Sequence, residues 1–359
     1  MAAVKEQLNV GVVSAIGAAI HDAWPGFELD RYSHLALSGL ESREVMARVD
    51  HVGAALAATM PTDPGTSAHV IRAAVAAGGL QGWASLPVND YIAKTMVGLP
   101  AIGLPLLAVL TSNFSAEFAL RAFLLGQLPF TLEQCRRWAE DDNEHVRRLA
   151  SEGTRPRLPW GRQVRPLIDD PSHTSAIVNT LFDDESLYVR RSVANHLNDV
   201  SKDHPEHAVR VAQRWLERST HGDYVARHGL RTLVKRGDGA ALTTLGFGPA
   251  GGVVIREFSV SPEVVKIGSS VSLRAVLHAD SNQRAAIDYR VHYQGARGPN
   301  APKVFKFAVR TLSAGVAVVV QREQAFQHVS IRTIRPGRHT IDLQVNGRVA
   351  AQRDVEVVA

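Results

Sequence analysis

The amino-acid sequence predicts a mainly α-helical protein in two parts, a helical repeat domain followed by an all-β sandwich domain. Three observations support this prediction. Apolar residues follow helical spacing up to about residue 245, a local motif recurs about every 40 residues, and the apolar spacing changes to alternation after residue 252. The chain has 359 residues, of which 45% are hydrophobic and 21% are charged. These proportions allow more than one domain and exclude a mini-scaffold or a wholly disordered chain.

The first part begins with a helix and continues as short helices separated by prolines. In residues 10–20 large apolar side chains recur every four positions, which predicts the first helix of a globular protein rather than an export signal. The apolar run at 97–110 is 14 residues long and contains two prolines. It is too short to cross a bilayer, so we expect a buried bend and helix and no membrane contact.

A recurring motif places one or two arginines within two positions after a valine, with polar or acidic residues ahead of it. The valines are Val146, Val189 and Val225, at spacings of 43 and 36 residues. A period near 40 in a helical chain is typical of HEAT-like helix pairs, which stack into a curved solenoid with one concave face. The valines are expected to point into the stack. The arginines either brace neighbouring repeats or reach the concave face.

The helical part is predicted to end in a linker, because residues 245–252 contain four glycines and one proline. Short alternating or β-branched runs follow, and Asn346-Gly347 between the last two is a strong hairpin signal. Seven or eight short antiparallel strands indicate an immunoglobulin-like sandwich without its usual disulfide. The predicted domains are residues 1–245, a linker at 246–252 and a β domain at 253–359. The expected strands are 253–260, 271–279, 287–293, 304–312, 316–321, 329–333, 339–345 and 349–357.

Positive charge is concentrated in the β domain. The net charge is +5, with 25 Lys and Arg against 27 Asp and Glu up to residue 250, but 15 against 8 after it. A basic domain attached to a nearly neutral one suggests a polyanionic partner. Basic residues beside predicted turns, among them Arg335 and Arg338, are well placed for phosphate contacts.

Several common chemistries have no support in the sequence. The single cysteine, Cys135, excludes an intrachain disulfide and a multi-cysteine metal site, and it favours the cytoplasm. There is no HExxH, GxSxG or glycine-rich phosphate loop, and the fifteen histidines form no cluster with metal-ligand spacing. We therefore expect neither a metal nor a cofactor.

An unusual stretch at 147–165 surrounds Glu152 and Trp160 with six arginines. A helix starting near residue 144 would put Arg148 and Glu152 one turn apart on the same face, and the chain would then break at Gly153. A glutamate among arginines is often a structural salt bridge, and a tryptophan after proline is often a packing anchor. From the residues alone, this structural interpretation and a functional one both stay open.

Two further segments carry acidic residues in helical positions. Asn195 and Asp199 are four residues apart and share one helix face, whereas Asp203 precedes a proline and is expected to cap the next helix. Glu117 begins an otherwise apolar helix, where a lone carboxylate either complements the helix dipole or has a function.

The stretches 151–161 and 189–205 together closely resemble the AlkC branch of the HEAT-like DNA alkylation repair glycosylases. The resemblance implies a helical solenoid with an added immunoglobulin-like domain, and hydrolysis of the N-glycosidic bond of cationic alkylated bases, chiefly 3-methyladenine and 3-methylcytosine. It also implies that duplex DNA is held on the concave surface without a deep base pocket. The family's catalytic positions fall on Glu152, Asp199 and Trp160, with Glu117 as a further partner.

These residue types fit that chemistry. A cationic base leaves readily, so the enzyme must stabilise positive charge on the deoxyribose and place a water. Carboxylates and an indole face can do both.

We expect a monomeric bacterial protein, cytoplasmic and associated with the nucleoid, with duplex DNA containing alkylated bases as its partner. The expected DNA contacts are Arg148, Arg155, Arg157, Arg162, Arg190, Arg191, Lys202, Arg335 and Arg338.

Two alternative functions remain compatible with the residues. A catalytically silent HEAT-repeat scaffold could bind DNA structures without releasing a base. A protein-interaction adaptor could use the concave surface for another protein, and it would show no steep dependence of DNA binding on salt.

Overall fold

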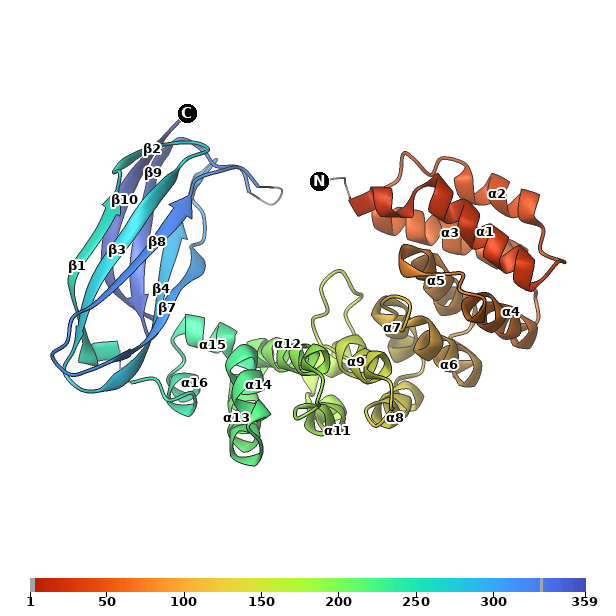
Figure 1. The fold of residues 1–359 in the computed structure, drawn as a ribbon, viewed down its shortest axis with the longest axis horizontal. Coiled ribbons are helices and arrows are strands. Elements are labelled where there is room, and N and C mark those ends of the chain that lie inside the picture. The colour runs from red at the N-terminus through yellow and green to blue at the C-terminus, as the bar shows by residue number, and fades with distance from the viewer. Residues whose placement is uncertain (1–3, 249, 330–331) are drawn as a thin grey trace. The chain divides into compact units, whose positions relative to one another are not determined.

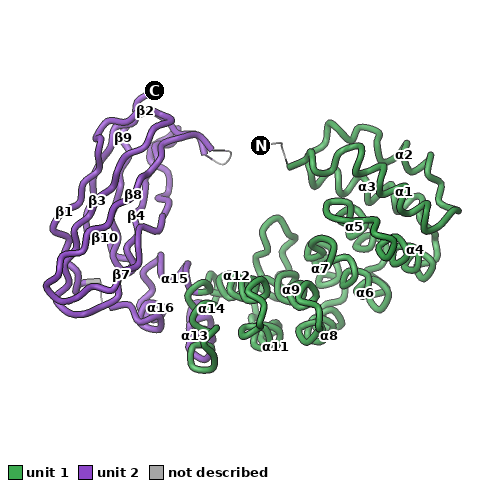
Figure 2. Tube along the Cα trace, in the orientation of Figure 1, with its two compact units in different colours: residues 1–204, 215–229 green, residues 205–214, 230–359 purple. Residues whose placement is uncertain are grey.

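The computed structural model describes residues 4–248, 250–329 and 332–359. These residues form a run of helices followed by a β-sandwich, which confirms the predicted fold class (Figure 1). The chain divides into two compact units, residues 1–204 with 215–229 and residues 205–214 with 230–359 (Figure 2). Helical residues 205–214 and those after residue 229 therefore group with the sandwich, and the predicted boundary at residues 246–252 stays a prediction.

The helices of the first unit stack as pairs in two rows (Figure 1). One row runs along the inner side of the arc and carries the residues discussed below. It contains α3 (Val45–Thr59), α5 (Ser85–Thr95), α7 (Glu117–Gly126), α9 (Glu144–Gly153), α12 (Leu187–Asp203) and α14 (His221–Gly229). The other row contains α1 (Val10–Ala23), α4 (Pro64–Ala76), α6 (Pro100–Leu110), α8 (Leu128–Trp138) and α11 (Ser172–Leu181).

The remaining elements complete the helical part. They are η1 (Val4–Leu8), α2 (Leu29–Leu37), η2 (Gly82–Ala84), α10 (Arg165–Asp169), α13 (Pro205–Arg218), α15 (Arg231–Arg236), α16 (Gly239–Thr244) and η3 (Ala250–Gly252). The expected helix at residues 10–20 is α1, and the apolar run at 97–110 contains α6 with Pro100 in its first turn. No helix in the described ranges is both long enough and apolar enough to span a membrane.

The repeated valines are all buried, as predicted, so the motif marks the packed face of the inner row. Val146 is 4% exposed, and Val189 and Val225 are fully buried. Arg147, which follows the first valine, donates to Asp184 in the next repeat and to the main-chain oxygens of 141 and 142. The bracing interpretation therefore holds for this arginine.

The second unit contains a sandwich with a three-stranded sheet, β1-β3-β8, and a five-stranded sheet, β2-β10-β9-β4-β7. Neighbouring strands are antiparallel except β2 and β10, which are parallel. Apolar residues such as Phe258, Leu273 and Ile341 fill the space between the sheets. The strands are β1 (Val253–Ser261), β2 (Val264–Lys266), β3 (Ser270–Ala279), β4 (Gln283–His292), β5 (Gln294–Gly295), β6 (Gly298–Pro299), β7 (Lys303–Leu312), β8 (Val318–Ala325), β9 (Gly337–Val345) and β10 (Arg348–Val358).

The turn between β9 and β10 has the predicted residues and geometry. Asn346 has φ +45° and Gly347 has φ +77°, as a tight hairpin turn requires. The expected strand at 329–333 is wrong for the residues described, because Val329 and Arg332 form only an isolated bridge and residues 330–331 lie outside the described ranges. Sequence patterning also missed β2, β5 and β6, since runs of two or three residues carry no detectable period.

Candidate active site

Three predicted carboxylates lie on neighbouring helices of the inner row. Glu117 is the first residue of α7, Glu152 is in the last turn of α9, and Asp199 is in the last two turns of α12. Their exposed fractions are only 6%, 7% and 0%. Because burying a carboxylate without a partner is costly, cationic partners are expected within hydrogen-bonding distance.

Basic side chains alternate with these carboxylates. Arg148 Nη1 lies 3.2 Å from Glu117 Oε2, and Arg148 Nη2 lies 3.7 Å from Glu152 Oε1. Arg155 donates from Nη1 to Glu152 Oε1 at 2.6 Å and from Nε to Asp199 Oδ2 at 2.8 Å. The series ends at Lys202, whose Nζ is 2.9 Å from Asp199 Oδ1. We call these six side chains the carboxylate cluster, in which three negative and three positive charges balance.

Arg155 is the buried centre of the carboxylate cluster. Burial alone would lower the pKa of Arg155, but the charge of Glu152 and the hydrogen bond to Asp199 outweigh burial and raise the pKa. Its buried position departs from the phosphate contact expected from the sequence. Arg155 instead holds Glu152 and Asp199, which come from different helices, on either side of one guanidinium.

Neutral hydrogen bonds fix the other side of Glu152. Ser192 on α12 donates to Glu152 Oε2 at 2.8 Å. His196 lies one turn after Ser192 on α12. Its Nδ1 is 3.1 Å from the main-chain oxygen of Ser151, and its Nε2 is 3.0 Å from the hydroxyl of Thr174. Burial lowers the pKa of His196 from 6.5 to about 4, so the imidazole is neutral near pH 7. His196 therefore packs α9 against α12 as an uncharged group.

Trp160 projects from the segment that joins α9 and α10. Its side chain is 79% exposed, and its backbone has φ +63°, in the left-handed region that tryptophan rarely adopts. A strained backbone persists only where surrounding contacts impose it. An exposed indole on a strained turn is available to a ligand rather than to the core.

Arg121 on α7 holds that segment in place. Its Nε donates to the main-chain oxygen of Arg162 at 2.7 Å, and its Nη1 donates to those of Gly153 and Arg155 at 3.1 and 2.6 Å. Burial lowers the pKa of Arg121 from 12.5 to about 10, which still leaves it charged at neutral pH. Sequence reasoning missed this residue, although an arginine on an apolar helix four positions after Glu117 was an available signal.

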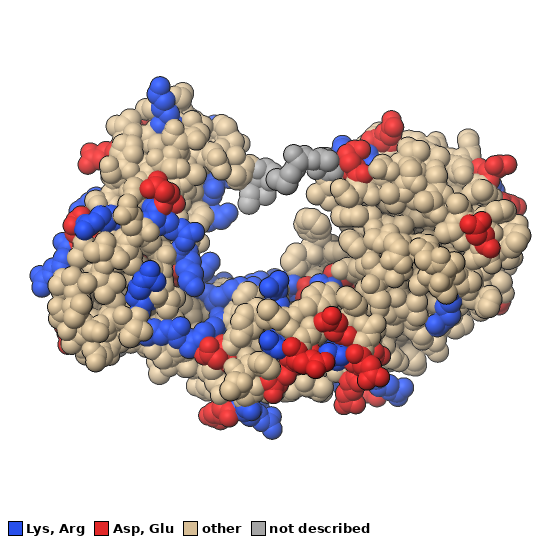
Figure 3. Space-filling view, viewed as in Figure 1, with Lys and Arg blue, Asp and Glu red and all other residues tan. Residues whose placement is uncertain are grey.

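The other expected DNA contacts differ in their surroundings. Arg162, Arg191 and Lys202 are exposed in the first unit, and Arg335 and Arg338 are exposed in the second. Arg190 donates to the main-chain oxygens of 184 and 185, as a brace would. Figure 3 shows that Lys and Arg outnumber acidic side chains on the visible face of the sandwich.

Asp203 does not cap the following helix as predicted. His204 occupies the N-cap position of α13 and makes no side-chain capping hydrogen bond. The carboxylate of Asp203 instead accepts from Nε and Nη2 of Arg157 at 2.7 and 2.6 Å. This pair ties the Trp160 segment to the end of α12. In the part of the chain that the structure describes, no group of three or more His, Cys, Asp or Glu side chains could hold a metal ion.

Comparisons with known proteins match both units. A family model described as a DNA alkylation repair enzyme matches residues 111–233, which include Glu117, Glu152 and Asp199. A second model, for the C-terminal Ig-like domain of the uncharacterised protein YhaZ, matches residues 254–359. The protein YhaZ of Bacillus subtilis (strain 168), itself uncharacterized, is 33% identical over 358 residues, which cover 99% of this chain and 100% of YhaZ.

A solved structure matches the whole chain. It is the alkylpurine DNA glycosylase AlkC of Pseudomonas fluorescens, bound to DNA containing an abasic site analog. The sequence identity is 37% and the TM-score is 0.93, with 99% of this chain and 100% of that chain covered. The match extends over both the helical repeats and the sandwich, as the motifs at 151–161 and 189–205 led us to expect. The chain therefore belongs to the AlkC-type family of DNA alkylation repair glycosylases.

Proposed function

We propose that this protein hydrolyses the N-glycosidic bond of cationic N-alkylated bases, such as 3-methyladenine and 3-methylcytosine, in duplex DNA without taking the base into a deep pocket. The observation that carries the proposal is the carboxylate cluster, in which arginines join three carboxylates from neighbouring helices, while the exposed Trp160 lies on the segment that follows one of these helices. The P. fluorescens relative supports it, because that protein is an alkylpurine glycosylase and was captured on DNA.

The reaction requires negative charge close to the sugar. The C1′–N bond breaks and its electron pair goes to the cationic base, which leaves as a neutral molecule. The positive charge that develops on the deoxyribose is stabilised by Glu152 and Asp199, and the Trp160 indole adds cation–π attraction. Water then forms the new bond to C1′ and gives its proton to a carboxylate. Because the leaving base is already charged, no general acid is needed to protonate it.

Two carboxylate oxygens are best placed for the water. Among the described residues, Glu117 Oε1 has no hydrogen-bond partner, whereas Oε2 is held by Arg148. Asp199 Oδ1 is held by Lys202, an exposed and flexible side chain that a DNA phosphate would attract away. We therefore assign water activation to Glu117 or Asp199 and charge stabilisation to all three carboxylates. The exposed Arg162, Arg191 and Lys202 would bind the phosphates on either side of the lesion.

The test is release of the methylated base from alkylated duplex DNA by the wild type, Asp199→Asn and Glu152→Gln. Each variant is expected to lose about 10²-fold or more of the single-turnover rate. The matched control is Glu133→Gln, an exposed glutamate on α8 that pairs with Arg136 and Arg137. Rates within twofold of the wild type for both cluster variants would overturn the assignment. DNA binding without any base release by the wild type would favour a silent DNA-binding scaffold.

A further inference from the structure

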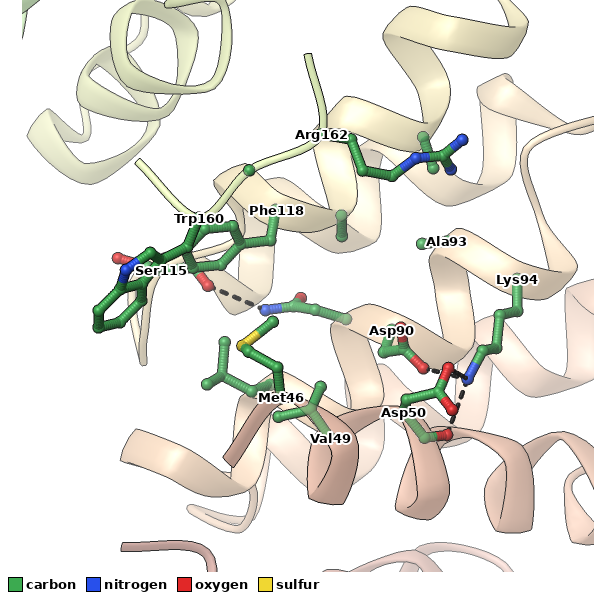
Figure 4. Close-up of a pocket in the computed structure, with 15 residues that line it drawn as sticks. Met46, Val49, Asp50, Asp90, Ala93, Lys94, Ser115, Phe118, Trp160 and Arg162 are labelled. Atoms are coloured by element: carbon green, nitrogen blue, oxygen red, sulfur yellow. Dashed lines mark hydrogen bonds and ion pairs between the residues drawn. The ribbon is translucent and has the colours of Figure 1, made fainter. Parts of the chain in front are cut away.

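A cleft of about 330 Å³ opens in the inner row beside the carboxylate cluster, between α3, α5, α7 and the Trp160 segment (Figure 4). Its volume is at the lower end of the range of about 300–1,000 Å³ that is typical of small-molecule sites. Trp160, Phe118 and Ser115 lie at one end of the cleft, and Lys94 lies with Asp50 and Asp90 at the other (Figure 4). Of the residues that line the cleft, the mechanism proposed above uses only Trp160 and Arg162.

Asn89, which lines this cleft, has an unpaired hydrogen-bond acceptor. The residue is 2% exposed, and its Nδ2 donates to the main-chain oxygen of Ser115 at 3.2 Å. That bond fixes the orientation of the amide, because the reverse orientation would place two oxygens together. The Oδ1 atom is buried and has no hydrogen-bond partner among the described residues. A buried acceptor of this kind is satisfied by a ligand that brings an N–H group.

The two ends of the cleft restrict the rest of the ligand. At one end the Trp160 indole, the Phe118 ring and the Met46 side chain offer flat apolar surface for an aromatic ring. At the other end Lys94 Nζ lies 3.0 Å from Asp50 Oδ1 and is also paired with Asp90, so this group carries a net negative charge. Arg162 also lines the cleft, so the formal charges of Asp50, Asp90, Lys94 and Arg162 balance, and a neutral base fits this balance better than a charged nucleotide does.

Ser115 connects the cleft to the carboxylate cluster. Its main-chain oxygen accepts from Asn89, while its hydroxyl accepts from Arg148 Nη1 at 3.2 Å. The same Arg148 nitrogen contacts Glu117 Oε2 at 3.2 Å. Ser115 therefore contacts both the cleft and the carboxylate cluster. A base that leaves the sugar at the cluster needs to move only past this residue, along the same row of helices, to enter the cleft.

We propose that this cleft is a product site that holds the excised base, an aromatic heterocycle whose exocyclic amino group donates to Asn89 Oδ1 while its ring packs against Trp160. This inference rests on the proposed function, since it assigns a place to that reaction's product. The base enters only after its bond to the sugar has broken, so no deep pocket is needed during catalysis. Selection of an amino group would retain methylated adenine and cytosine and disfavour bases with an oxo group at that position.

The experiment is calorimetric titration of the full chain with free 3-methyladenine, adenine and hypoxanthine, in which an oxo group replaces the amino group. We expect the two amino bases to bind and hypoxanthine to bind about tenfold more weakly, as the loss of one buried hydrogen bond would cause. Asn89→Ala should weaken binding of the amino bases by a similar factor and abolish the preference over hypoxanthine. Equal affinities for the three bases, or an Asn89→Ala variant that keeps the preference, would overturn the proposal.

A second variant covers the case in which Asn89→Ala does not fold. Ala122→Leu adds bulk to the cleft from α7 and should also weaken base binding, whereas Ala76→Leu on the exposed end of α4 should not. Base release by the wild type separates the two proposals. Base binding that depends on Asn89 without any release would reject the glycosylase function alone, and normal release without base binding would reject the product site alone.

Discussion

Arg121 and Arg162 are joined by a hydrogen bond in which the Nε of the first donates to the main-chain oxygen of the second at 2.7 Å, across 41 positions of sequence. The same guanidinium binds two more main-chain oxygens, at Gly153 and Arg155. One buried side chain on α7 therefore sets the course of the segment that presents Trp160.

Arg121→Met should destabilise the protein and displace Trp160. Each buried main-chain oxygen left unpaired costs about 1–3 kcal/mol, so thermal unfolding should occur at a clearly lower temperature than in the wild type. Arg121 acts through the Trp160 segment, so the base-release rate should also fall at temperatures where the variant is still folded. Arg72→Met, at an exposed position on α4, is the matched control. A folded Arg121→Met protein with a wild-type rate would contradict this positioning role.

Two substitutions of Trp160 should separate its backbone strain from its side-chain function. Because the residue has φ +63°, Trp160→Gly should be more stable than Trp160→Ala by about 1–2 kcal/mol, as measured by urea unfolding. Both variants should lose base-release activity, because both lack the indole. An alanine variant as stable as the glycine variant would show that the left-handed conformation is not kept in solution.

The pair formed by Arg155 and Asp199 should behave as a coupled unit. Removing either partner leaves a buried charge, so Arg155→Met and Asp199→Asn should each lower the free energy of unfolding by about 3–5 kcal/mol. The double variant should lose less than the sum of the single losses, because neither charge is then left alone. Chemical denaturation of the four proteins gives the coupling energy, and strict additivity would argue against a direct interaction.

His196 should make the stability depend on pH in the acidic range. Burial lowers its pKa in the folded protein to about 4, whereas the unfolded chain titrates near 6.5. The unfolded state therefore binds more protons between these values. The resulting contribution to stability, about 3 kcal/mol at most, is full above pH 6.5 and is lost as the pH falls to 4. The difference between the unfolding free energies of the wild type and His196→Gln should shrink over that window, and a constant difference would contradict the prediction.

Deleting residues 253–359 should leave the helical repeats folded, because each stacks only on its neighbours. We expect weaker DNA affinity, lower glycosylase activity and a shallower dependence of the binding constant on salt, since fewer phosphates are neutralised. A second truncation after residue 229 also removes α15 and α16, which group with the sandwich. Circular dichroism tests folding, and unfolding of both truncated proteins would contradict two autonomous domains.

The fold could be predicted from the sequence because the spacing of apolar residues is set by positions that are close together in the chain. The buried valines Val146, Val189 and Val225 and the turn at Asn346 follow from spacing and conformational preference within a few residues. Motif resemblance made Glu152 and Asp199 candidate site residues, but no local rule shows that Arg155 joins them. That contact requires α9 and α12 to stack, and it spans 44 positions between Arg155 and Asp199.

Contacts between residues far apart in the sequence also account for the features that could not be predicted. Asp203 was expected to cap the next helix because its neighbours in sequence suggested it, yet its partner is Arg157, 46 positions away. Arg121 binds only main-chain oxygens, which every residue possesses, so no particular residue type marks its partners. The unpaired oxygen of Asn89 becomes visible only when three helices are packed around it.

The three carboxylates come from three successive helix pairs, one from each. During synthesis, a nascent chain that has not yet emerged beyond α12 therefore lacks part of the set, however well its earlier repeats have folded. An insertion or deletion of one pair between α7 and α12 would leave a stable stack in which the acids no longer meet. Under the mechanism proposed above, such a protein would keep the architecture and lose base release, so only relatives in which these three pairs are continuous would retain the reaction.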